Sequence, residues 1–550
     1  MKKSLLLAIS AALASSSLMA GGIMTNTNQS AGYARTVSRN ASLGIDAVYF
    51  NPAGLTKLGN GFHLSLNNQS IFQTKDVVNN YPYLNGTPTT FVGDVKAMVF
   101  PGVYAVYKMD KLAFSFGFNP VGGGGGATYA TGLPSFEIPI SDLVPMLGRK
   151  SATDPGFGVT NYTTDINFEG SSVYLGYQVG VSYEINPSIS LFAGIRTVTA
   201  DNSYKGTIKN ISINPTIANT VYAGQFVKAK DFGTERATYY TGVANSYTGA
   251  ANGAGSLVAA GLGSYTYAQA FAAGAINATQ KAQFEGALVA AGQPANTPIG
   301  TSQVVYTTVA GQAKAGAAQM TGLAAGTGDK EVDAVQKGTG YTPIFGANLT
   351  LAEKLTVAIK YELATKIVLT NETKIDQTGA FPDSAQSRSD MPAMLAIGVS
   401  YPVTKKLVAS LSFNYYWDKK ADYGKKDETG KYIANDAVID NNLYEFGLGL
   451  EYNFTEKFLL SAGFLNAKTG VSKAYQTDLS YSLSSNTAAF GGQYKISPAV
   501  ALNLGALYTM YSDDDKTYNH KLGTNLIPVT ETYSKSNWLV AIGVDIKIGK

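Results

Sequence analysis

The sequence predicts an all-β protein: a transmembrane antiparallel β-barrel of about 14 strands. Three observations support this prediction. Apolar and polar residues alternate along segments longer than the roughly 5–6 residues usual in soluble strands, and near the 9–11 that a tilted membrane strand needs. Short and long connections alternate between these segments, as in outer-membrane barrels. The 59 glycines and 35 tyrosines fit such a barrel better than an α/β enzyme.

Residues 1–20 have the features of a secretory signal peptide. Lys2 and Lys3 precede a short apolar run, and cleavage is expected after Ala20. That run is too short to cross a bilayer as a helix, and no later segment reaches 18 consecutive apolar residues. The chain has no cysteine, which excludes a lipoprotein anchor and a disulfide framework. We therefore expect export to the outer membrane of a Gram-negative bacterium.

The alternation has a period of two, which separates residues by face in a strand but scatters them around a helix. One segment places these apolar residues on one face: Trp538, Val540, Ile542, Val544, Ile546 and Ile548. In another segment the residues Glu445, Gly447, Gly449 and Glu451 lie on one face. The apolar residues between and around them lie on the other face: Tyr444, Phe446, Leu448, Leu450, Tyr452 and Phe454. Apolar faces toward lipid and polar faces toward a lumen also explain a mean hydropathy near zero (−0.01).

Fourteen strands are expected, within residues 61–550. Their expected starts are near Gly61, Ala97, Lys111, Ser171, Pro187, Gly340, Lys354, Asp390, Lys405, Asn441, Lys457, Ser484, Pro498 and Lys535. Short turns on the periplasmic side separate long extracellular loops, expected at 73–95, 125–170, 203–339, 370–389, 418–440, 468–483 and 512–534.

Residues 21–60 precede the first strand and lack alternation. A disordered periplasmic tail is one interpretation, because chain ends are often disordered. A hatch, or plug, folded inside the lumen is the other. Apolar residues such as Ile45, Val48 and Phe50 favour the hatch, since a solvated tail has no need to bury them.

The third strand meets Asn119-Pro120 and then a glycine run that includes Gly122 and Gly123. Proline removes a ladder donor, and glycine weakens a strand. Either the strand ends there in a flexible loop, or pairing fails at membrane height and leaves a kink in the wall. A phosphate-binding loop is excluded, because neither Lys-Ser/Thr nor a helix start follows the glycines.

Residues 203–339 form a large Ala/Gly-rich insertion. One interpretation is a low-complexity surface loop, and the other is a helical extracellular cap. The part from Tyr267 to Ala291 has a weak apolar stripe that is compatible with helix.

The segment Asp46-Ala47-Val48-Tyr49-Phe50-Asn51-Pro52-Ala53-Gly54-Leu55 resembles the plug signature of the FadL/TodX-type family, outer-membrane transporters of long-chain fatty acids and aromatic hydrocarbons. Weaker similarities are Phe116-Gly117-Phe118-Asn119-Pro120 and Asp390-Met391-Pro392-Ala393. The resemblance implies a 14-stranded barrel with Asn51, Pro52 and Ala53 in its hatch. It also implies capture of a hydrophobic ligand at the extracellular loops, an apolar pocket beside the hatch, and lateral exit at the third-strand kink by passive diffusion.

Two features depart from the family. The chain ends Ile548-Gly549-Lys550 where a terminal aromatic is usual, and the 203–339 insertion is long.

A carboxylate head group would need donors in the lumen. Strand parity suggests Arg196, Lys360 and Lys366 as candidates. The alternative is that these cations pair with lumen acids, for which Glu362, Glu445 and Glu451 are at hand.

Other function classes fit less well. A net charge of +4 is too small to suggest nucleic-acid binding. The only histidines are His63 and His520, and neither has a recognisable nucleophile by spacing, so we expect no enzyme, no catalytic residue and no metal or cofactor. A porin for small hydrophilic solutes is the main alternative. The expected partners are hydrophobic small molecules, outer-membrane lipid and lipopolysaccharide, and the barrel-assembly machinery, with the protein as a monomer.

Overall fold

The structure is a computed structural model that describes residues 29–148, 156–218, 220–352, 354–426 and 431–548. The expected signal peptide, 1–20, lies outside the described residues. The described chain divides into two compact units. The barrel unit comprises 29–138, 166–208 and 330–548, and the helical unit comprises 139–165 and 209–329 apart from the undescribed positions.

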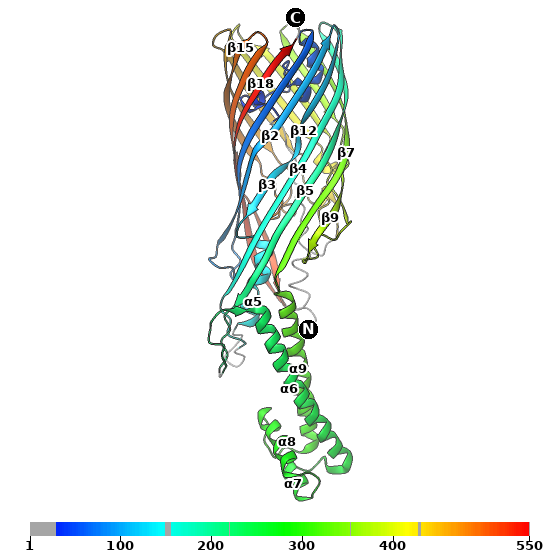
Figure 1. Ribbon diagram of the computed structural model, residues 1–550, viewed down its shortest axis with the longest axis vertical. Coiled ribbons are helices and arrows are strands. Elements are labelled where there is room, and N and C mark those ends of the chain that lie inside the picture. The colour runs from blue at the N-terminus through cyan, green and yellow to red at the C-terminus, as the bar shows by residue number, and fades with distance from the viewer. Residues whose placement is uncertain (1–28, 149–155, 219, 353, 427–430, 549–550) are drawn as a thin grey trace. The chain divides into compact units, whose positions relative to one another are not determined.

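Antiparallel strands close into a ring (Figure 1). The ring has 14 strands, so the expected number of about 14 is confirmed. The ring strands are β1 (Gly61–Asn79), β2 (Thr89–Met109), β3 (Leu112–Tyr129), β4 (Tyr162–Asn186), β5 (Ile189–Ile213), β7 (Lys330–Leu351), β8 (Leu355–Glu362), β11 (Met394–Pro402), β12 (Leu407–Tyr416), β13 (Tyr444–Asn453), β14 (Phe458–Lys468), β15 (Ser485–Ser497), β16 (Val500–Tyr511) and β18 (Asn525–Ile548). The last strand pairs with the first, from Phe62 opposite Ile548 to Asn79 opposite Glu531.

The two faces of the ring differ as the alternation predicted. On β13, Phe446 and Leu448 are exposed, whereas Glu445 between Tyr444 and Phe446 is buried. On β18, Trp538 is 53% exposed while its neighbour Leu539 is fully buried. A closed antiparallel ring with an apolar outer face and a polar inner face is the architecture of an outer-membrane β-barrel.

Among the described residues, no helix combines the length and the apolar character needed to cross a membrane.

Several strands extend beyond the residues in which apolar and polar positions alternate. β1 and β2 pair through most of 73–95, which was expected to be a loop. Residues 512–534 form the hairpin of β17 (Asp514–Leu522) with β18, so His520 lies on a strand and not in a loop. Beyond the bilayer both strand faces meet water, so pairing persists there without an apolar face to reveal it. Two further strands, β9 (Val368–Asp376) and β10 (Gln386–Arg388), replace much of the loop expected at 370–389.

The insertion is shorter than 203–339 and is helical. β5 continues to Ile213 and β7 begins at Lys330, because polar residues there pair without apolar alternation. After the two-residue strand β6 (Val227–Lys228), the helices are α6 (Ala229–Leu257), a π-helical turn (Val258–Leu262), α7 (Tyr267–Ala272), α8 (Ala278–Ala290) and α9 (Ile299–Gly326). Two of them fall within 267–291, where helix was expected.

Small residues let the long helices α6 and α9 approach closely. A Cβ on Gly233 of α6 would lie 2.9 Å from the backbone of Met320 and Ala324 on α9. Tyr267, Leu288 and Tyr306 are fully buried in the core that α6 to α9 share. Capping boxes at Thr266 and Asn277 start α7 and α8.

The remaining helices are short. They are α2 (Ala31–Ala34), α3 (Ala47–Phe50) and the 3₁₀ helix η1 (Pro52–Lys57) before the first strand, α4 (Pro134–Ser141) and α5 (Leu143–Leu147) after β3, and two 3₁₀ turns, Asp418–Lys420 and Asn435–Ala437, between β12 and β13.

Candidate functional site: the N-terminal segment and a break in the wall

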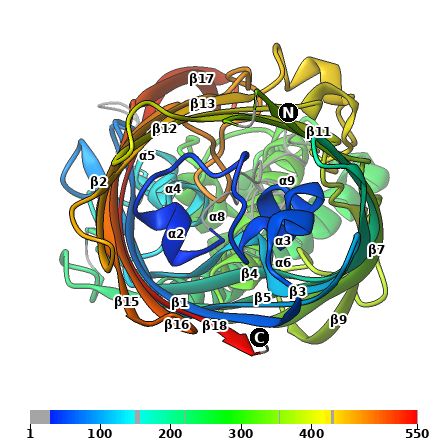
Figure 2. The ribbon, with the colours of Figure 1, turned by 90° about the horizontal axis from the view of Figure 1, so that it is seen from above.

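The N-terminal segment, defined here as residues 29–58, lies inside the ring (Figure 2). It contains α2, α3 and η1, and its apolar side chains are buried against the inner wall. Tyr33 and Phe50 stack with ring centroids 5.6 Å apart, which joins α2 to α3. The described part of 21–60 is therefore folded and is not a solvated tail.

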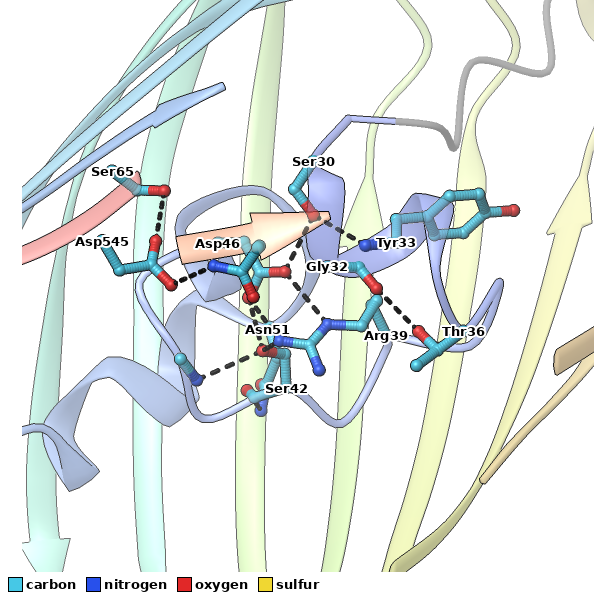
Figure 3. Close-up of polar contacts among 12 residues, drawn as sticks. Ser30, Gly32, Tyr33, Thr36, Arg39, Ser42, Asp46, Asn51, Ser65 and Asp545 are labelled. Carbon is cyan, nitrogen blue, oxygen red and sulfur yellow. Dashed lines mark hydrogen bonds and ion pairs between the residues drawn. The ribbon is translucent and has the colours of Figure 1, made fainter. Parts of the chain in front are cut away.

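Asp46 organises the loop between α2 and α3 (Figure 3). Its carboxylate accepts hydrogen bonds from Ser30 Oγ (2.9 Å) and Ser42 Oγ (2.6 Å). The Arg39 guanidinium donates to both carboxylate oxygens, at 3.0 and 2.8 Å. Burial raises the pKa of Asp46, but the charge of Arg39 and these hydrogen bonds outweigh burial and hold the pKa below its usual value. Asp46 is thus an anion that ties three points of the segment together.

The motif Asn51-Pro52-Ala53 joins the segment to the wall. Asn51 Nδ2 donates to the Ser42 carbonyl (3.1 Å) and to Asn348 Oδ1 on β7 (2.8 Å). The carbonyl of Pro52 accepts from Ser182 Oγ on β4 at 2.6 Å. The carbonyl of Ala53 accepts from Ser190 Oγ on β5 at 2.8 Å. Pro52 also starts η1, where its missing N–H costs nothing.

Inward-facing glycines make room for the segment on the opposite wall. A Cβ on Gly447 would lie 2.6 Å from the Val37 carbonyl oxygen, and one on Gly505 would lie 2.8 Å from the Arg35 nitrogen. A Cβ on Gly463 would overlap the Thr36 carbonyl. The alternating glycines of these strands therefore mark where the segment touches the barrel.

Two of the three head-group candidates lie beneath the segment and are already paired. Arg196 is fully buried and forms a bidentate ion pair with Glu362, at 2.7 and 3.0 Å. Lys360 Nζ donates to Glu362 (2.8 Å) and to the backbone carbonyl of Tyr49 on α3 (2.6 Å). Both cations also face the Tyr49 ring, at 5.0 and 4.6 Å from its centroid. Glu362 thus bridges both cations, and the cluster, with one net positive charge, holds α3 to the wall.

The other two lumen acids suggested as partners, Glu445 and Glu451, have different hydrogen-bond partners. Glu451 pairs with Arg35 at 2.6 Å, so it also holds the N-terminal segment. Glu445 is buried and accepts from the neutral groups Asn414 Nδ2 and Tyr416 Oη, both at 3.0 Å.

Lys366, the third candidate, does not face the lumen. It is exposed, and the residues on either side of it, Thr365 and Ile367, are buried. β8 ends at Glu362, and the irregular residues that follow shift the alternation by one. Strand parity counted from β8 was therefore wrong for Lys366, because it assumed an unbroken strand.

The third strand does not end at its glycines, since β3 pairs with β4 as far as Tyr129. Two register shifts occur on the way, one between Pro120 and Gly122 and one between Gly122 and Gly125. Pairing with β2 is lost instead. After Val103 opposite Phe118, the next pair is Val95 opposite Ala127. We call this unpaired stretch of β2 (96–102) and β3 (119–126) the wall break.

β2 contributes to the wall break through a bulge toward β1. Residues Met98 and Val99 have no register partner on β1, and Val99 is 73% exposed. The Met98 carbonyl instead accepts from the side chains of Asn68 (3.2 Å) and Ser70 (3.0 Å). Pro101-Gly102, which ends the bulge, is a sequence signal of the same kind as Asn119-Pro120 and could have located this edge of the break.

Gln29 lies against the wall break from inside. Its Nε2 donates to the Pro120 carbonyl (2.9 Å), and its Oε1 accepts from Asn119 Nδ2 (2.6 Å). The backbone carbonyl of Gln29 accepts from Tyr104 Oη on β2 at 2.6 Å. Gln29, Asn119 and Tyr104 are all buried, so the N-terminal segment contacts both edges of the break.

Gly123 is required by the backbone at this point. Its φ is +89°, and a Cβ there would overlap the Ser172 carbonyl of β4. A side chain at Gly126 would only reach van der Waals contact, 3.6 Å from Ser171 Cβ. The glycines of the run are therefore not equivalent.

A small apolar hollow lies near the other end of the strands. Its lining includes Phe136 of α4, Phe168 of β4 and Phe381 after β9. Phe136 and Phe168 are in edge contact with centroids 5.2 Å apart.

The two histidines lie on different strands, His63 on β1 and His520 on β17. His63 bonds the Gly59 carbonyl at 2.7 Å, and His520 packs against the Tyr81 ring at 4.9 Å. No group of three or more metal-ligating side chains occurs in the part of the chain that the structure describes.

No protein-family model and no curated protein matches this sequence. Among solved structures, a Pseudomonas aeruginosa FadL homologue is similar along 96% of this chain and 100% of its own, with 12% identity and a TM-score of 0.55. The chain has the FadL fold.

Other similar structures have lower scores. The Pseudomonas putida toluene transporter TodX matches 95% of this chain and 99% of its own at 12% identity, with a TM-score of 0.48. The Ralstonia pickettii toluene transporter TbuX matches 92% of this chain and 94% of its own at 14% identity, with a TM-score of 0.44. At these identities the FadL fold is what the similarity establishes.

Proposed function

We propose that this protein mediates passive uptake of hydrophobic compounds, long-chain fatty acids or aromatic hydrocarbons, across the outer membrane. The observation that carries the proposal is the wall break between β2 and β3, contacted from inside by Gln29. A barrel for hydrophilic solutes needs an open lumen and no interruption of its wall.

The wall break suits an apolar cargo. An apolar molecule leaves water readily but crosses a polar lumen poorly. Lateral exit through the wall would deliver it into the lipid without passage along the whole lumen. The exposed Met98 and Val99 beside the break give the outer edge of that exit an apolar surface.

In this proposal the N-terminal segment is a hatch. Its attachments are hydrogen bonds and ion pairs, such as those of Asn51 to Asn348 and Arg35 to Glu451, so it can rearrange without breaking covalent bonds. Because it occupies the lumen, it argues against the porin alternative. Asn51, Pro52 and Ala53 would anchor the hatch, and Asn119, Pro120, Gly122 and Gly123 would form the exit.

Capture would begin at the extracellular end. The apolar hollow lined by Phe136, Phe168 and Phe381 is a candidate first site for cargo. Diffusion down a concentration gradient then needs no cofactor and no chemistry. The Arg196–Glu362–Lys360 cluster, in which both cations already share one carboxylate, would hold the hatch and not the cargo.

The test is uptake of labelled oleate and labelled toluene by cells with and without the protein. We expect faster entry of at least one of them when the protein is present. Faster entry of small sugars, with no change for oleate or toluene, would replace the proposal with the porin.

Lateral exit has its own test. A Cβ on Gly102 would lie 3.0 Å from the Gln29 carbonyl, so Gly102→Leu fills the wall break. Ala488→Leu is the matched control, since it adds the same side chain to the exposed outer face of β15, away from the break. We expect Gly102→Leu to lower uptake several-fold in correctly folded barrels and the control to leave it unchanged. Equal uptake in both variants would remove the lateral exit.

A further inference from the structure

Two lysines face each other on the inner surface of the ring. Lys75 of β1 lies directly opposite Lys535 of β18 in the register of these strands. The next pair on the same face, Val77 and Tyr533, is fully buried, so this face points into the barrel. Both lysine side chains are partly buried.

Neither ammonium group has an acidic partner within the residues that the structure describes. Lys75 forms no hydrogen bond or ion pair there, and the ammonium of Lys535 lies over the ring of Tyr511, 4.8 Å from its centroid. Glu531, on the same face of β18, is four residues away and accepts from Asn79 (3.0 Å) and Tyr518 (3.2 Å). Like charges directly opposite on a sheet repel each other and destabilise the pair.

Two unsatisfied amides lie next to the lysines. Gln73 and Asn537 form a register pair on the same face, two residues along from Lys75 and Lys535. Gln73 Nε2 and Asn537 Oδ1 are buried and have no hydrogen-bond partner. Unpaired buried polar atoms are costly and indicate a missing partner. Gln73 Nε2 is a donor and can donate to an oxygen ligand, whereas Asn537 Oδ1 is an acceptor.

We propose that Lys75 and Lys535, with Gln73, bind the carboxylate of an amphiphilic cargo inside the lumen. This inference rests on the uptake function proposed above and adds the substrate class to it. A carboxylate between the two lysines relieves their repulsion and accepts from the unpaired Gln73 Nε2. Charge-assisted hydrogen bonds of this kind are about twice as strong as neutral ones.

The position of the site fits transport toward the wall break. On β1, Phe72 pairs with Lys96, the first residue of the unpaired stretch of β2. Phe72 is three residues from Lys75, roughly 10 Å along a strand. A cargo held by its head group at Lys75 can therefore extend its apolar tail toward the break. The cations beside the hatch do not compete, because Glu362 occupies both Arg196 and Lys360.

The experiment measures binding of labelled oleate and labelled oleyl alcohol by the purified full-length protein in a non-ionic detergent. The two probes share a chain and differ in the head group. In the double variant Lys75→Gln/Lys535→Gln, we expect oleate affinity to fall about tenfold or more, since loss of charged hydrogen bonds typically exceeds 1.4 kcal/mol. Oleyl alcohol affinity should not change.

Two control variants separate charge from folding. Lys337→Gln/Lys366→Gln removes two exposed lysines and should leave both affinities unchanged. Lys75→Arg/Lys535→Arg keeps the charges and should retain oleate binding. Unchanged oleate affinity in the Gln variant, equal losses for both probes, or an equal loss in the Arg variant would each overturn the carboxylate site.

Failure of the site and failure of the proposed function give different results. If the unmodified protein speeds uptake of toluene and oleyl alcohol, but the Gln variant binds oleate normally, only the carboxylate site is overturned. If the unmodified protein speeds none of the hydrophobic probes, the proposed function fails, and the carboxylate site fails with it.

Discussion

Asn119 Nδ2 lies 2.6 Å from Gln29 Oε1, so the interrupted strand β3 and the start of the N-terminal segment hold each other directly. Gln29 returns a hydrogen bond to the Pro120 carbonyl at 2.9 Å. Both bonds lie where β2 and β3 do not pair with each other. The segment thus replaces part of the missing strand pairing.

Gln29→Ala should release this end of the segment. It removes both side-chain hydrogen bonds and leaves Asn119 buried without its partner. We expect the attachment of the segment to be weakened by about 1–3 kcal/mol. Hydrogen exchange at residues 30–36 should become faster than in the unmodified protein. Gln493→Ala, which removes an amide hydrogen bond to Asn503 on the far wall, is the control. Equal exchange rates for residues 30–36 in all three proteins would contradict the role of Gln29.

Glu362→Gln should be strongly destabilising. It leaves two buried cations, Arg196 and Lys360, without their anion, and such losses typically amount to about 3–5 kcal/mol. The measurement is the free energy of unfolding by denaturant in detergent micelles. Glu372→Gln is the matched control, because it breaks an exposed pair with Lys337 and should cost at most about 1 kcal/mol. Similar losses of stability for both variants would contradict the prediction that the buried cluster stabilises the barrel more than the exposed pair does.

Gly463→Leu should displace the segment from the lumen. Its Cβ would overlap the Thr36 carbonyl, and the strand cannot move away because Gly463 is paired with β13 and β15 on its two sides. We expect higher single-channel conductance in planar bilayers, since the segment then fills the lumen less completely. Ala462→Leu adds the same side chain one residue away, on the exposed outer face, and should keep the conductance of the unmodified protein. A Gly463→Leu barrel with unchanged conductance would contradict the prediction.

The connection between β12 and β13 should become more stable as pH rises above 7. Lys425 is buried there beside the Tyr475 ring (4.0 Å) and Ser480 Oγ (3.1 Å). Burial, with the charge of Lys516, lowers the pKa of Lys425 to about 7. The unfolded chain keeps the ordinary value of about 10.4 and binds more protons between these two values, so stability increases with pH in that window.

Hydrogen exchange at residues 433–439, corrected for its intrinsic pH dependence, measures this effect. Protection should rise between pH 7 and 10 in the unmodified protein. Lys425→Met should remove the rise, and the exposed Lys419→Met should retain it. A rise that survives in Lys425→Met would assign the pH dependence to another group.

The sequence was informative wherever lipid lies on one side of a strand. Trp538 and Leu539 differ so much in exposure because one meets lipid and the other the interior, and that contrast made the strands countable. Above the bilayer the contrast disappears. The sequence therefore did not predict β17. The expected bounds of the insertion, 203–339, were also too broad, because residues at both of its ends pair with each other in β5 and β7.

The candidate site was only partly predictable. Proline and glycine at 119–126 indicated one edge of the wall break, and Pro101-Gly102 held equal information about the other. Parity located Arg196 and Lys360 in the lumen but failed for Lys366, where the strand is interrupted. Lys75 and Lys535 are 460 positions apart, and only the closure of the ring brings them together.

Because β1 pairs with β18, the barrel can close only after the last strand has been synthesised. Until Asn525–Ile548 has been made, the wall has two free edges, which are surfaces prone to aggregation. The N-terminal segment touches β16 and β18, for example at Gly505 and Gly543, so residues synthesised early find their final neighbours only after the last strand arrives. A nascent chain must therefore be shielded until synthesis is complete, and any truncation before β18 yields an open sheet with an unfilled interior.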